Sequence, residues 1–247
     1  MSKIKWSYGV LTVPQRRDNL LPVTLASLEE AGFNNPTLFV DNCELSDIDS
    51  YATRHYPLVF RISPGVLAFG NWFLALWELY LKNPASQFFA LFEDDILVCS
   101  NLRQYLEQSE YPKSGYWNLY TAMENESLVE GKEGWALSNQ LGRGALALVF
   151  DKTAVMKILA ANHIVNRVQN TSRGCKGIDG AVSDAMKQSH YKEYVHNPSL
   201  VQHMGIETTI KRPRYISNNP SFKPSSLFRG KDFDVLELLK RREANNV

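Results

Sequence analysis

The sequence has few cysteines, no long apolar segment and no excess of either charge. Its three cysteines, Cys43, Cys99 and Cys175, show neither the C-x-x-C spacing of a zinc site nor the density of a disulfide scaffold, so we expect reduced thiols. Lysine and arginine number 27 against 26 acidic residues, which argues against a surface devoted wholly to nucleic acid or anionic lipid but allows a local basic patch. The most apolar segment, residues 66–81, is interrupted by polar residues and is shorter than the ~20 residues that span a bilayer. We therefore expect no transmembrane segment.

The N-terminus lacks the pattern of a secretory signal. Its first ten residues, MSKIKWSYGV, enter a strand-like pattern without a long apolar stretch or a small-residue cleavage site. We therefore expect a cytoplasmic location, in a bacterium or a phage-infected host cell. Internal repeats and low-complexity tracts are also absent, and no obligate protein partner is evident.

Short apolar runs alternate with helical patterns through the first half of the chain. Strand-like runs cover residues 6–13, 37–40, 58–62 and 87–92, and a helical pattern covers residues 68–81. Such alternation predicts a mainly parallel sheet with helices on both faces. At 247 residues with 44% hydrophobic content, the chain can bury the core of a single α/β domain.

The second half is less regular. Strands are expected at residues 116–120 and 145–150, with a polar loop between them, over residues 124–144, that is long enough to be a lid. A helix from residue 152 to about residue 161 is followed by a polar connection, a short helix from Asp179, and a final amphipathic segment.

The strongest local signal is a run of three acids, Glu93, Asp94 and Asp95, directly after the apolar strand QFFALF. Ligands gather at the carboxyl ends of parallel strands. A close pair of like charges costs on the order of 4 kcal/mol at an effective dielectric near 20, so a partly buried trio requires a cation or hydrogen-bond donors. Mg2+ and Mn2+ fit, because one or two carboxylates commonly hold them together with substrate phosphates. The simpler alternative is that Asp94 and Asp95 cap a turn and stay solvated.

A histidine further along the chain is a second candidate ligand. His203 lies between the strand-like pair Leu200 and Val201 and the turn residue Gly205, where a neutral imidazole could complete a metal site. Taken by itself, such a histidine is more often structural.

The order of these motifs resembles the GT-A glycosyltransferases, and within them the N-acetylglucosaminyltransferase IV family. The shared motifs are WSYGVLTVPQRR, LFVD, LFEDD, GIDGAVSDAM and NPSLVQHMG, in that order. The resemblance implies a GT-A type, Rossmann-like fold and a glycosyltransferase domain over residues 1–210. Residues 211–247 would then form a basic C-terminal extension with a short terminal helix.

The resemblance also implies roles for individual residues. Asp95 would bind Mn2+ or Mg2+, with His203 as the second protein ligand. Asp179 would be the catalytic base, although Asp184 is an alternative because the spacing between the two acids is one residue longer than in the family. Donor binding would involve Thr12, Val13 and Arg16 after the first strand, Asp41 as the acid that reads the base, Asp94 facing the ribose or sugar, and Glu93 as a support. Lys211, with Arg212, could neutralise the diphosphate or be a solvated surface residue.

These roles lead to the expectation of sugar transfer from a nucleotide-diphosphate donor, with a UDP-sugar favoured, to a hydroxyl acceptor such as a glycan. A divalent cation stabilises the negative charge of the departing diphosphate, and a carboxylate accepts the proton of the attacking hydroxyl. If Asp179 lies on the face opposite the leaving group, the anomeric centre is inverted.

Two other functions stay open. A phage-type DNA glycosyltransferase would modify a hydroxymethylated pyrimidine base; the basic tail and the lack of an export signal favour it, and the near-zero net charge opposes it. A non-catalytic sugar- or nucleotide-binding module would keep the same fold.

Overall fold

Strands and helices alternate along the chain, as the apolar pattern predicts. The computed structural model describes residues 4–52, 55–169, 177–205 and 224–245. The strands of the central sheet are β1 (Trp6–Thr12), β2 (Thr37–Cys43), β3 (Leu58–Ile62), β4 (Phe88–Glu93), β6 (Gly115–Asn118), β7 (Gly134–Leu137), β8 (Ala147–Asp151) and β9 (Lys192–Asn197).

The strand order across this sheet is β3-β2-β1-β4-β8-β6-β9-β7. Strand β1 pairs in parallel with β2 and β4, and β2 pairs in parallel with β3, whereas β8 and β7 run against their neighbours. The mainly parallel sheet is therefore confirmed. Thr12 pairs with Val40, and Leu11 pairs with Glu93. The carboxyl ends of β1, β2 and β4 thus lie along one edge.

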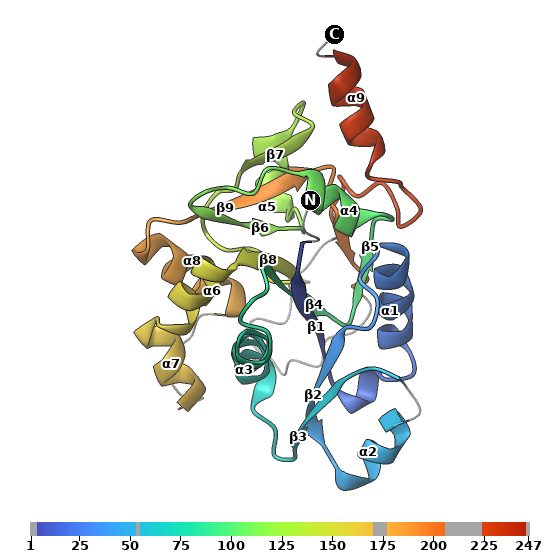
Figure 1. Ribbon diagram of the computed structural model, residues 1–247, viewed down its shortest axis with the longest axis vertical. Helices are drawn as coiled ribbons and strands as arrows, with labels where there is room; N and C mark the ends of the chain where they lie inside the picture. The colour runs from blue at the N-terminus through green and yellow to red at the C-terminus, as the bar shows by residue number, and fades with distance from the viewer. Residues whose placement is uncertain (1–3, 53–54, 170–176, 206–223, 246–247) are drawn as a thin grey trace, which may run out of the picture.

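Helices cover both faces of the sheet (Figure 1), which confirms the predicted α/β fold class. They are α1 (Leu20–Glu30), α2 (Leu45–Ala52), α3 (Leu67–Lys82), α4 (Leu102–Gln108), α5 (Met123–Val129), α6 (Lys152–Leu159), α7 (Asn162–Gln169), α8 (Ile178–Gln188), α9 (Glu237–Asn245) and the short 3-10 helix η1 (Pro14–Arg16). Among the described residues, none of these helices has the length and apolar character needed to cross a bilayer.

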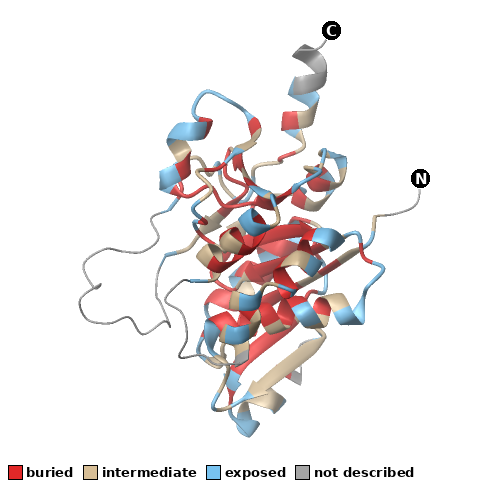
Figure 2. Ribbon diagram, turned by 90° about the vertical axis from the view of Figure 1, so that its left-hand side faces the viewer, coloured by how far each residue is buried: buried red, intermediate tan, exposed pale blue. Residues whose placement is uncertain are grey.

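Two hydrophobic cores, one on each face, explain why β4 is apolar up to its last residue, Glu93. Ala90 and Phe92 pack in the core that contains Leu21 of α1, whereas Phe89 and Leu91 pack in the core that contains Trp72 of α3. Buried residues accordingly concentrate in the central sheet and on the inner sides of its helices (Figure 2). Because both faces are covered, the four side chains from Phe89 to Phe92 are all buried, and the polar alternation of a half-exposed strand is lost.

A second, two-stranded sheet lies beside the first. Strand β5 (Ile96–Val98) pairs antiparallel with β10 (Val201–His203), and His203 is opposite Ile96. The pairing brings residues about a hundred positions apart in the sequence next to the carboxyl end of β4.

The structure differs from the expected loop over residues 124–144 and from the expected polar connection before Asp179. The first contains α5 and β7, and the second contains α7. Strand β7 has only four residues and forms because Trp135 and its neighbours pair with β9. Helix α7 buries Ile164 in the core with α3. Both elements depend on distant partners, so their local sequence patterns are too short to indicate them.

The described part of the C-terminal segment packs into the main core. Val235 and Leu238 are fully buried there, and Asp234 forms a strand-like bridge with Ser100. The helix expected at the end of the chain is α9.

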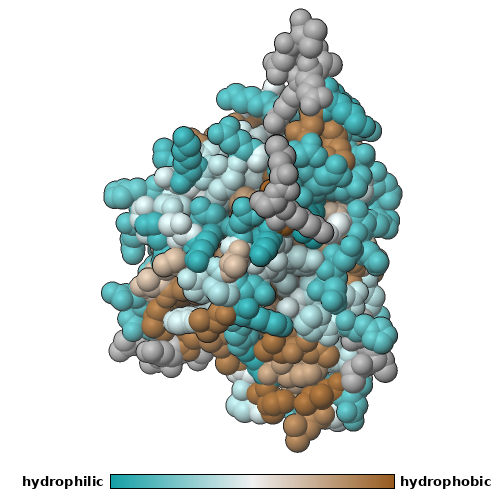
Figure 3. Space-filling view, viewed as in Figure 1, coloured by the Kyte–Doolittle hydropathy of each residue, from teal (hydrophilic) through white to brown (hydrophobic). Residues whose placement is uncertain are grey.

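Exposed apolar side chains gather near the free edge of the sheet. Ile62 ends β3, Leu67 begins α3 and Leu45 begins α2, and all three are exposed. Hydrophobic surface is visible at this lower end of the molecule in Figure 3.

Candidate functional site

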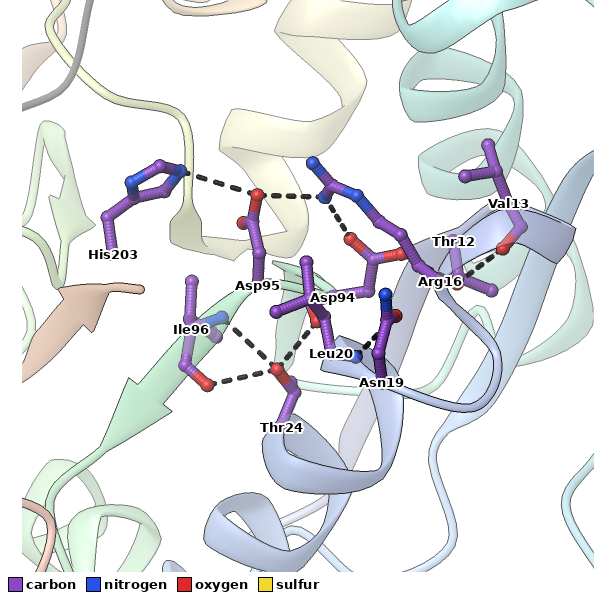
Figure 4. Close-up of polar contacts among 10 residues, drawn as sticks. All are labelled: Thr12, Val13, Arg16, Asn19, Leu20, Thr24, Asp94, Asp95, Ile96 and His203. Atoms are coloured by element: carbon purple, nitrogen blue, oxygen red, sulfur yellow. Dashed lines mark hydrogen bonds and ion pairs between the residues drawn. The ribbon is translucent and has the colours of Figure 1, made fainter. Parts of the chain in front are cut away.

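The acids predicted as the centre of the site lie between β4 and β5, at the carboxyl edge of the parallel strands. Asp94 and Asp95 are buried, with 2% and 6% of their surfaces exposed. In Figure 4, Asp95 lies between His203 and Arg16, and Asp94 approaches Arg16 from the side of Thr12. The structure therefore brings together five of the residues that the sequence motifs single out.

A threonine of α1 fixes the turn that carries these acids. The Thr24 hydroxyl lies 2.8 Å from the carbonyl oxygen of Asp94 and 2.9 Å from that of Ile96, and it accepts a hydrogen bond of 3.1 Å from the Ile96 N–H. On the other side, the Met204 N–H donates to the Asp95 carbonyl at 2.8 Å. These bonds satisfy the buried backbone of the turn. The two carboxylates are thereby left to face the site.

Asp94 is held on both of its oxygens. The Thr12 hydroxyl donates to Oδ2 at 2.6 Å, and Arg16 Nη1 donates to Oδ1. Burial raises the pKa of Asp94, although Arg16 and Thr12 act in the opposite direction. Asp94 is thus a fixed link between β1, η1 and the end of β4.

Asp95 has one oxygen in use and one buried without a hydrogen-bond partner. Oδ2 accepts from Arg16 Nη1 at 2.8 Å and lies 3.3 Å from Nε2 of His203. Oδ1 is buried and has no partner. Burial acts to raise the pKa of Asp95, but the hydrogen bond and charge of His203 and the charge of Arg16 outweigh it and lower the pKa. An ionised carboxylate with a buried, unpartnered oxygen is costly, and a cation shared by both Asp95 oxygens would remove this cost.

The spacing of Asp95 and His203 fits a shared metal ion. Two adjacent ligands of an octahedral ion, each about 2.0–2.1 Å from it, are about 3 Å apart, and the observed separation of Oδ2 and Nε2 is 3.3 Å. In the described part of the chain, however, no group of three or more His, Cys, Asp or Glu side chains is arranged to hold a metal. A cation at this pair would need further ligands from phosphate oxygens and water, which is the usual way in which Mg2+ is held.

Arg16 supplies the positive charge that the run of acids requires. Its guanidinium is largely buried, with 11% of the side chain exposed, and it pairs with both Asp94 and Asp95. Burial of the Glu93 carboxyl group raises its pKa well above the usual value, and the charges of Asp95 and Asp94 add to the effect. The sequence predicts a cation or hydrogen-bond donors beside these acids, and Arg16 provides both.

Val13, directly after β1, and Asp41, near the end of β2, both form hydrogen bonds with the backbone. The Val13 carbonyl accepts from the Arg16 N–H at 3.0 Å and so begins η1. Asp41, at the end of β2, is buried and accepts from the Val66 N–H at 2.9 Å. A Cβ on Gly65 would lie 2.5 Å from Asp41 Oδ1, so glycine allows this close approach. Whether Asp41 also reads a base stays a prediction.

Asp179 lies in the first turn of α8 and is oriented by backbone donors. Gly144 N–H donates to its Oδ2 at 3.2 Å and Gly180 N–H to its Oδ1 at 2.8 Å. Leu146 follows Gly144 by two residues, which span at most ~7 Å. Its carbonyl oxygen accepts a hydrogen bond of 2.8 Å from the Glu93 N–H. The loop before β8 therefore connects Asp179 to the end of β4.

Glu193 in β9 is a residue of this region that the sequence argument missed. It is buried and accepts hydrogen bonds from Ser138 at 2.6 Å, Tyr116 at 3.1 Å and Asn118 at 3.2 Å. Burial raises the pKa of Glu193 despite these donors, and the charge of Asp179 adds to the rise. A charged residue at an inward position of the strand KEYVHN was the available signal.

The side chain of Gln140 ties this network to the loop. The side-chain amide donates to the Glu193 carbonyl at 2.8 Å and accepts from the Glu193 N–H at 3.0 Å. The backbone carbonyl of Gln140 accepts from the Ser183 hydroxyl of α8 at 3.0 Å. Gln140 has a φ of 62°, a left-handed conformation that is uncommon outside glycine. The loop that holds Asp179 is therefore fixed from two sides, by β9 and by α8.

The remaining candidates belong to the basic tail. Lys211 and Arg212 lie outside the described residues. Of the described tail cations, Arg229 pairs with Glu133, and Arg241 pairs with Glu237. Lys231 pairs with Glu30 and Asp232. These three charges are balanced by the protein's own acids.

The chain is similar to solved structures at low sequence identity. No protein-family model matches the chain, and no curated protein matches it. A solved structure of a cytidylyltransferase from Leptospira borgpetersenii serovar Hardjo-bovis is similar over 99% of this chain and 96% of that chain, with 9% sequence identity and a TM-score of 0.46. A nucleoside-diphosphate-sugar pyrophosphorylase from Vibrio cholerae RC9 is similar over 81% of this chain and 96% of that chain, with 10% identity and a TM-score of 0.46. These similarities do not confirm the resemblance to the N-acetylglucosaminyltransferase IV family, and at this level they do not identify the activity of the chain.

Proposed function

We propose that this protein is a metal-dependent glycosyltransferase that uses a nucleotide-diphosphate sugar. The observation that carries the proposal is the approach of His203 Nε2 to Asp95 Oδ2, at 3.3 Å. Asp95, in the turn between β4 and β5, and His203, at the end of β10, meet at the carboxyl edge of a Rossmann-like sheet, where nucleotide ligands bind in folds of this architecture.

Asp95 and His203 would hold Mn2+ or Mg2+, with the diphosphate completing the ligand set. When bound, such an ion stabilises the negative charge that develops on a departing diphosphate. Thr12 and Arg16 bond to Asp94, which ties the loop after β1 to the turn that carries Asp95. The loop at Val13 and the buried Asp41 would flank the nucleoside, and Lys211 is a further candidate for the diphosphate.

Asp179 is the proposed base. Its carboxylate would accept the proton of the acceptor hydroxyl while that oxygen forms a bond to the anomeric carbon. The sugar–phosphate bond breaks at the same time, and its electron pair leaves with the diphosphate. A base and a leaving group on opposite faces of the sugar give inversion. Gly144 and Gly180 orient the Asp179 carboxylate from the backbone, which supports a fixed role in the reaction.

The acceptor is a hydroxyl compound, with a glycan favoured over DNA. The tail residues Arg229, Lys231 and Arg241 are paired with acids, which leaves these three less suited to neutralise phosphates of a duplex. Hydroxymethylated DNA is therefore tested as an alternative acceptor.

The test follows release of nucleoside diphosphate from a panel of UDP-, GDP- and dTDP-sugars, with glycan or hydroxymethylated DNA as acceptor. We expect release that requires Mn2+ or Mg2+ and stops on addition of EDTA. Release of pyrophosphate from nucleoside triphosphates and sugar phosphates would instead indicate a nucleotidyltransferase. Donor binding by calorimetry without any turnover would indicate a binding module.

A further inference from the structure

Arg16 and a metal ion would use the same carboxylate oxygen. Arg16 Nη1 lies 2.8 Å from Asp95 Oδ2, the oxygen that is 3.3 Å from His203 Nε2. The oxygen that fits a shared site with the imidazole is therefore already bonded to a guanidinium. Asp94 and Thr12 hold Arg16 there, because Asp94 accepts from both.

Two cations at one buried oxygen repel each other, and the surroundings screen them poorly. Arg16 and Asp95 are both largely buried, with 11% and 9% of their side chains exposed. A guanidinium keeps its charge at every relevant pH, so the repulsion cannot be relieved by loss of a proton. Either Arg16 leaves Oδ2, or an anion arrives to offset the added charge.

A diphosphate provides that anion. Guanidinium groups bind phosphate oxygens through paired hydrogen bonds. Arg16 follows the loop at Val13, at the edge of the sheet where the donor is proposed to lie. A rotation of its side chain from Asp95 to a phosphate would free Oδ2 and keep the positive charge within the site.

We propose that Arg16 competes with the divalent cation for Asp95, so that the cation binds tightly only together with a diphosphate. The inference rests on the proposed function, because it assumes that the site receives both ligands. In this arrangement the arginine keeps the acids neutralised before the donor binds and contacts the diphosphate afterwards.

Calorimetric titration with Mn2+ alone, and with Mn2+ in the presence of inorganic pyrophosphate, tests this proposal. In the parent protein, Mn2+ alone should bind weakly, and pyrophosphate should tighten it. The variant Arg16→Met should bind Mn2+ alone about tenfold more tightly than the parent. The factor by which pyrophosphate increases the Mn2+ affinity should be about tenfold smaller in this variant than in the parent. Arg17→Met is the matched control, because the half-buried Arg17 pairs with the exposed Asp18 and should leave both affinities unchanged.

The Mn2+ affinity of Arg16→Met decides whether the proposal holds. If Arg16→Met binds Mn2+ alone no more tightly than the parent, Arg16 does not compete for Asp95 and the proposal is wrong. Arg16→Gln, which keeps a hydrogen-bond donor without the charge, provides the same test if the methionine variant does not fold. The readout is independent of turnover. Tighter Mn2+ binding in Arg16→Met, with no sugar transfer by the parent, would support this inference and contradict the proposed function. Sugar transfer by the parent, with no tighter Mn2+ binding in Arg16→Met, would support the proposed function and contradict this inference.

Discussion

The Gly144 N–H donates a hydrogen bond of 3.2 Å to Oδ2 of Asp179, across 35 positions of the sequence. Gly144 has a φ of 74°, in the left-handed region that glycine tolerates. The loop that it belongs to continues into β8 and contacts Glu93 at the end of β4. One backbone donor thus links the proposed base to the run of acids.

Replacing the proposed base should remove catalysis and spare binding. Asp179→Asn keeps the shape of the side chain but cannot accept the hydroxyl proton, so we expect kcat to fall about 100- to 10,000-fold. The Kd of the nucleotide-sugar donor should stay close to that of the parent, as measured by calorimetry. Asp184→Asn is the matched control on the same helix. Full activity of Asp179→Asn with loss in Asp184→Asn would assign the base to Asp184.

The carboxyl group of Glu193 should make stability depend on pH. Its pKa is raised in the folded protein because the group is buried. The folded state therefore holds the proton more firmly than the unfolded state does, and the associated stability is complete below the ordinary glutamate pKa and is lost as pH rises through the raised value. Glu193→Gln has no such proton to lose.

The free energy of unfolding of Glu193→Gln, relative to that of the parent, should therefore improve as pH rises from the ordinary glutamate pKa through the raised pKa of Glu193. The comparison uses urea unfolding at several pH values, and any loss of hydrogen bonds appears as a constant offset. The exposed Glu130 provides the control variant Glu130→Gln, which should follow the parent. If the difference in free energy of unfolding between Glu193→Gln and the parent does not change as pH rises above the ordinary glutamate pKa, burial does not raise the pKa of Glu193.

The hydroxyl of Thr24 should stabilise the turn between β4 and β5. Thr24→Val preserves the shape but leaves the buried Ile96 N–H without its acceptor, which costs about 1–3 kcal/mol. Urea unfolding measures the loss, with the exposed Thr153→Val as control. We also expect weaker Mn2+ binding, because the same turn carries Asp95. Unchanged stability would mean that water replaces the hydroxyl.

Leu238 tests whether the C-terminal segment belongs to the folded core. It is fully buried against the main core, so Leu238→Ala should lower the free energy of unfolding by about 2–5 kcal/mol. The control is Leu81→Ala, because Leu81 is 64% exposed and should change stability little. If both variants unfold like the parent, the segment after residue 223 does not contribute to the cooperative core.

Much of the sheet was predictable because its strands are long enough to show a pattern. The run QFFALF predicted β4 to within one residue, since burial on both faces makes the whole strand apolar. The position of the acids at the carboxyl end of a parallel strand was predictable for the same reason. By contrast, β10 has three residues, and it places His203 beside Asp95 only through its pairing with β5. The sequence motif indicated the histidine, but no local pattern indicated the pairing.

The ion pairs of Arg16 and the hydrogen bonds of Glu193 were not predictable from the sequence, for a different reason. Both are charged residues whose burial depends on partners supplied by other elements: Asp94 and Asp95 for Arg16, and Ser138 for Glu193. Sequence alone shows a charged residue near an apolar run. Only the packed structure shows which opposite charge or donor compensates it.

The central claim is that Asp95 and His203 together hold the cation that binds the donor diphosphate. Pulsed electron paramagnetic resonance of Mn2+ bound with UDP tests it most directly, because a nitrogen bonded to the metal gives a characteristic hyperfine coupling. We predict this coupling in the parent and its loss in His203→Gln. A parent complex of protein, Mn2+ and UDP without any nitrogen coupling would contradict the account.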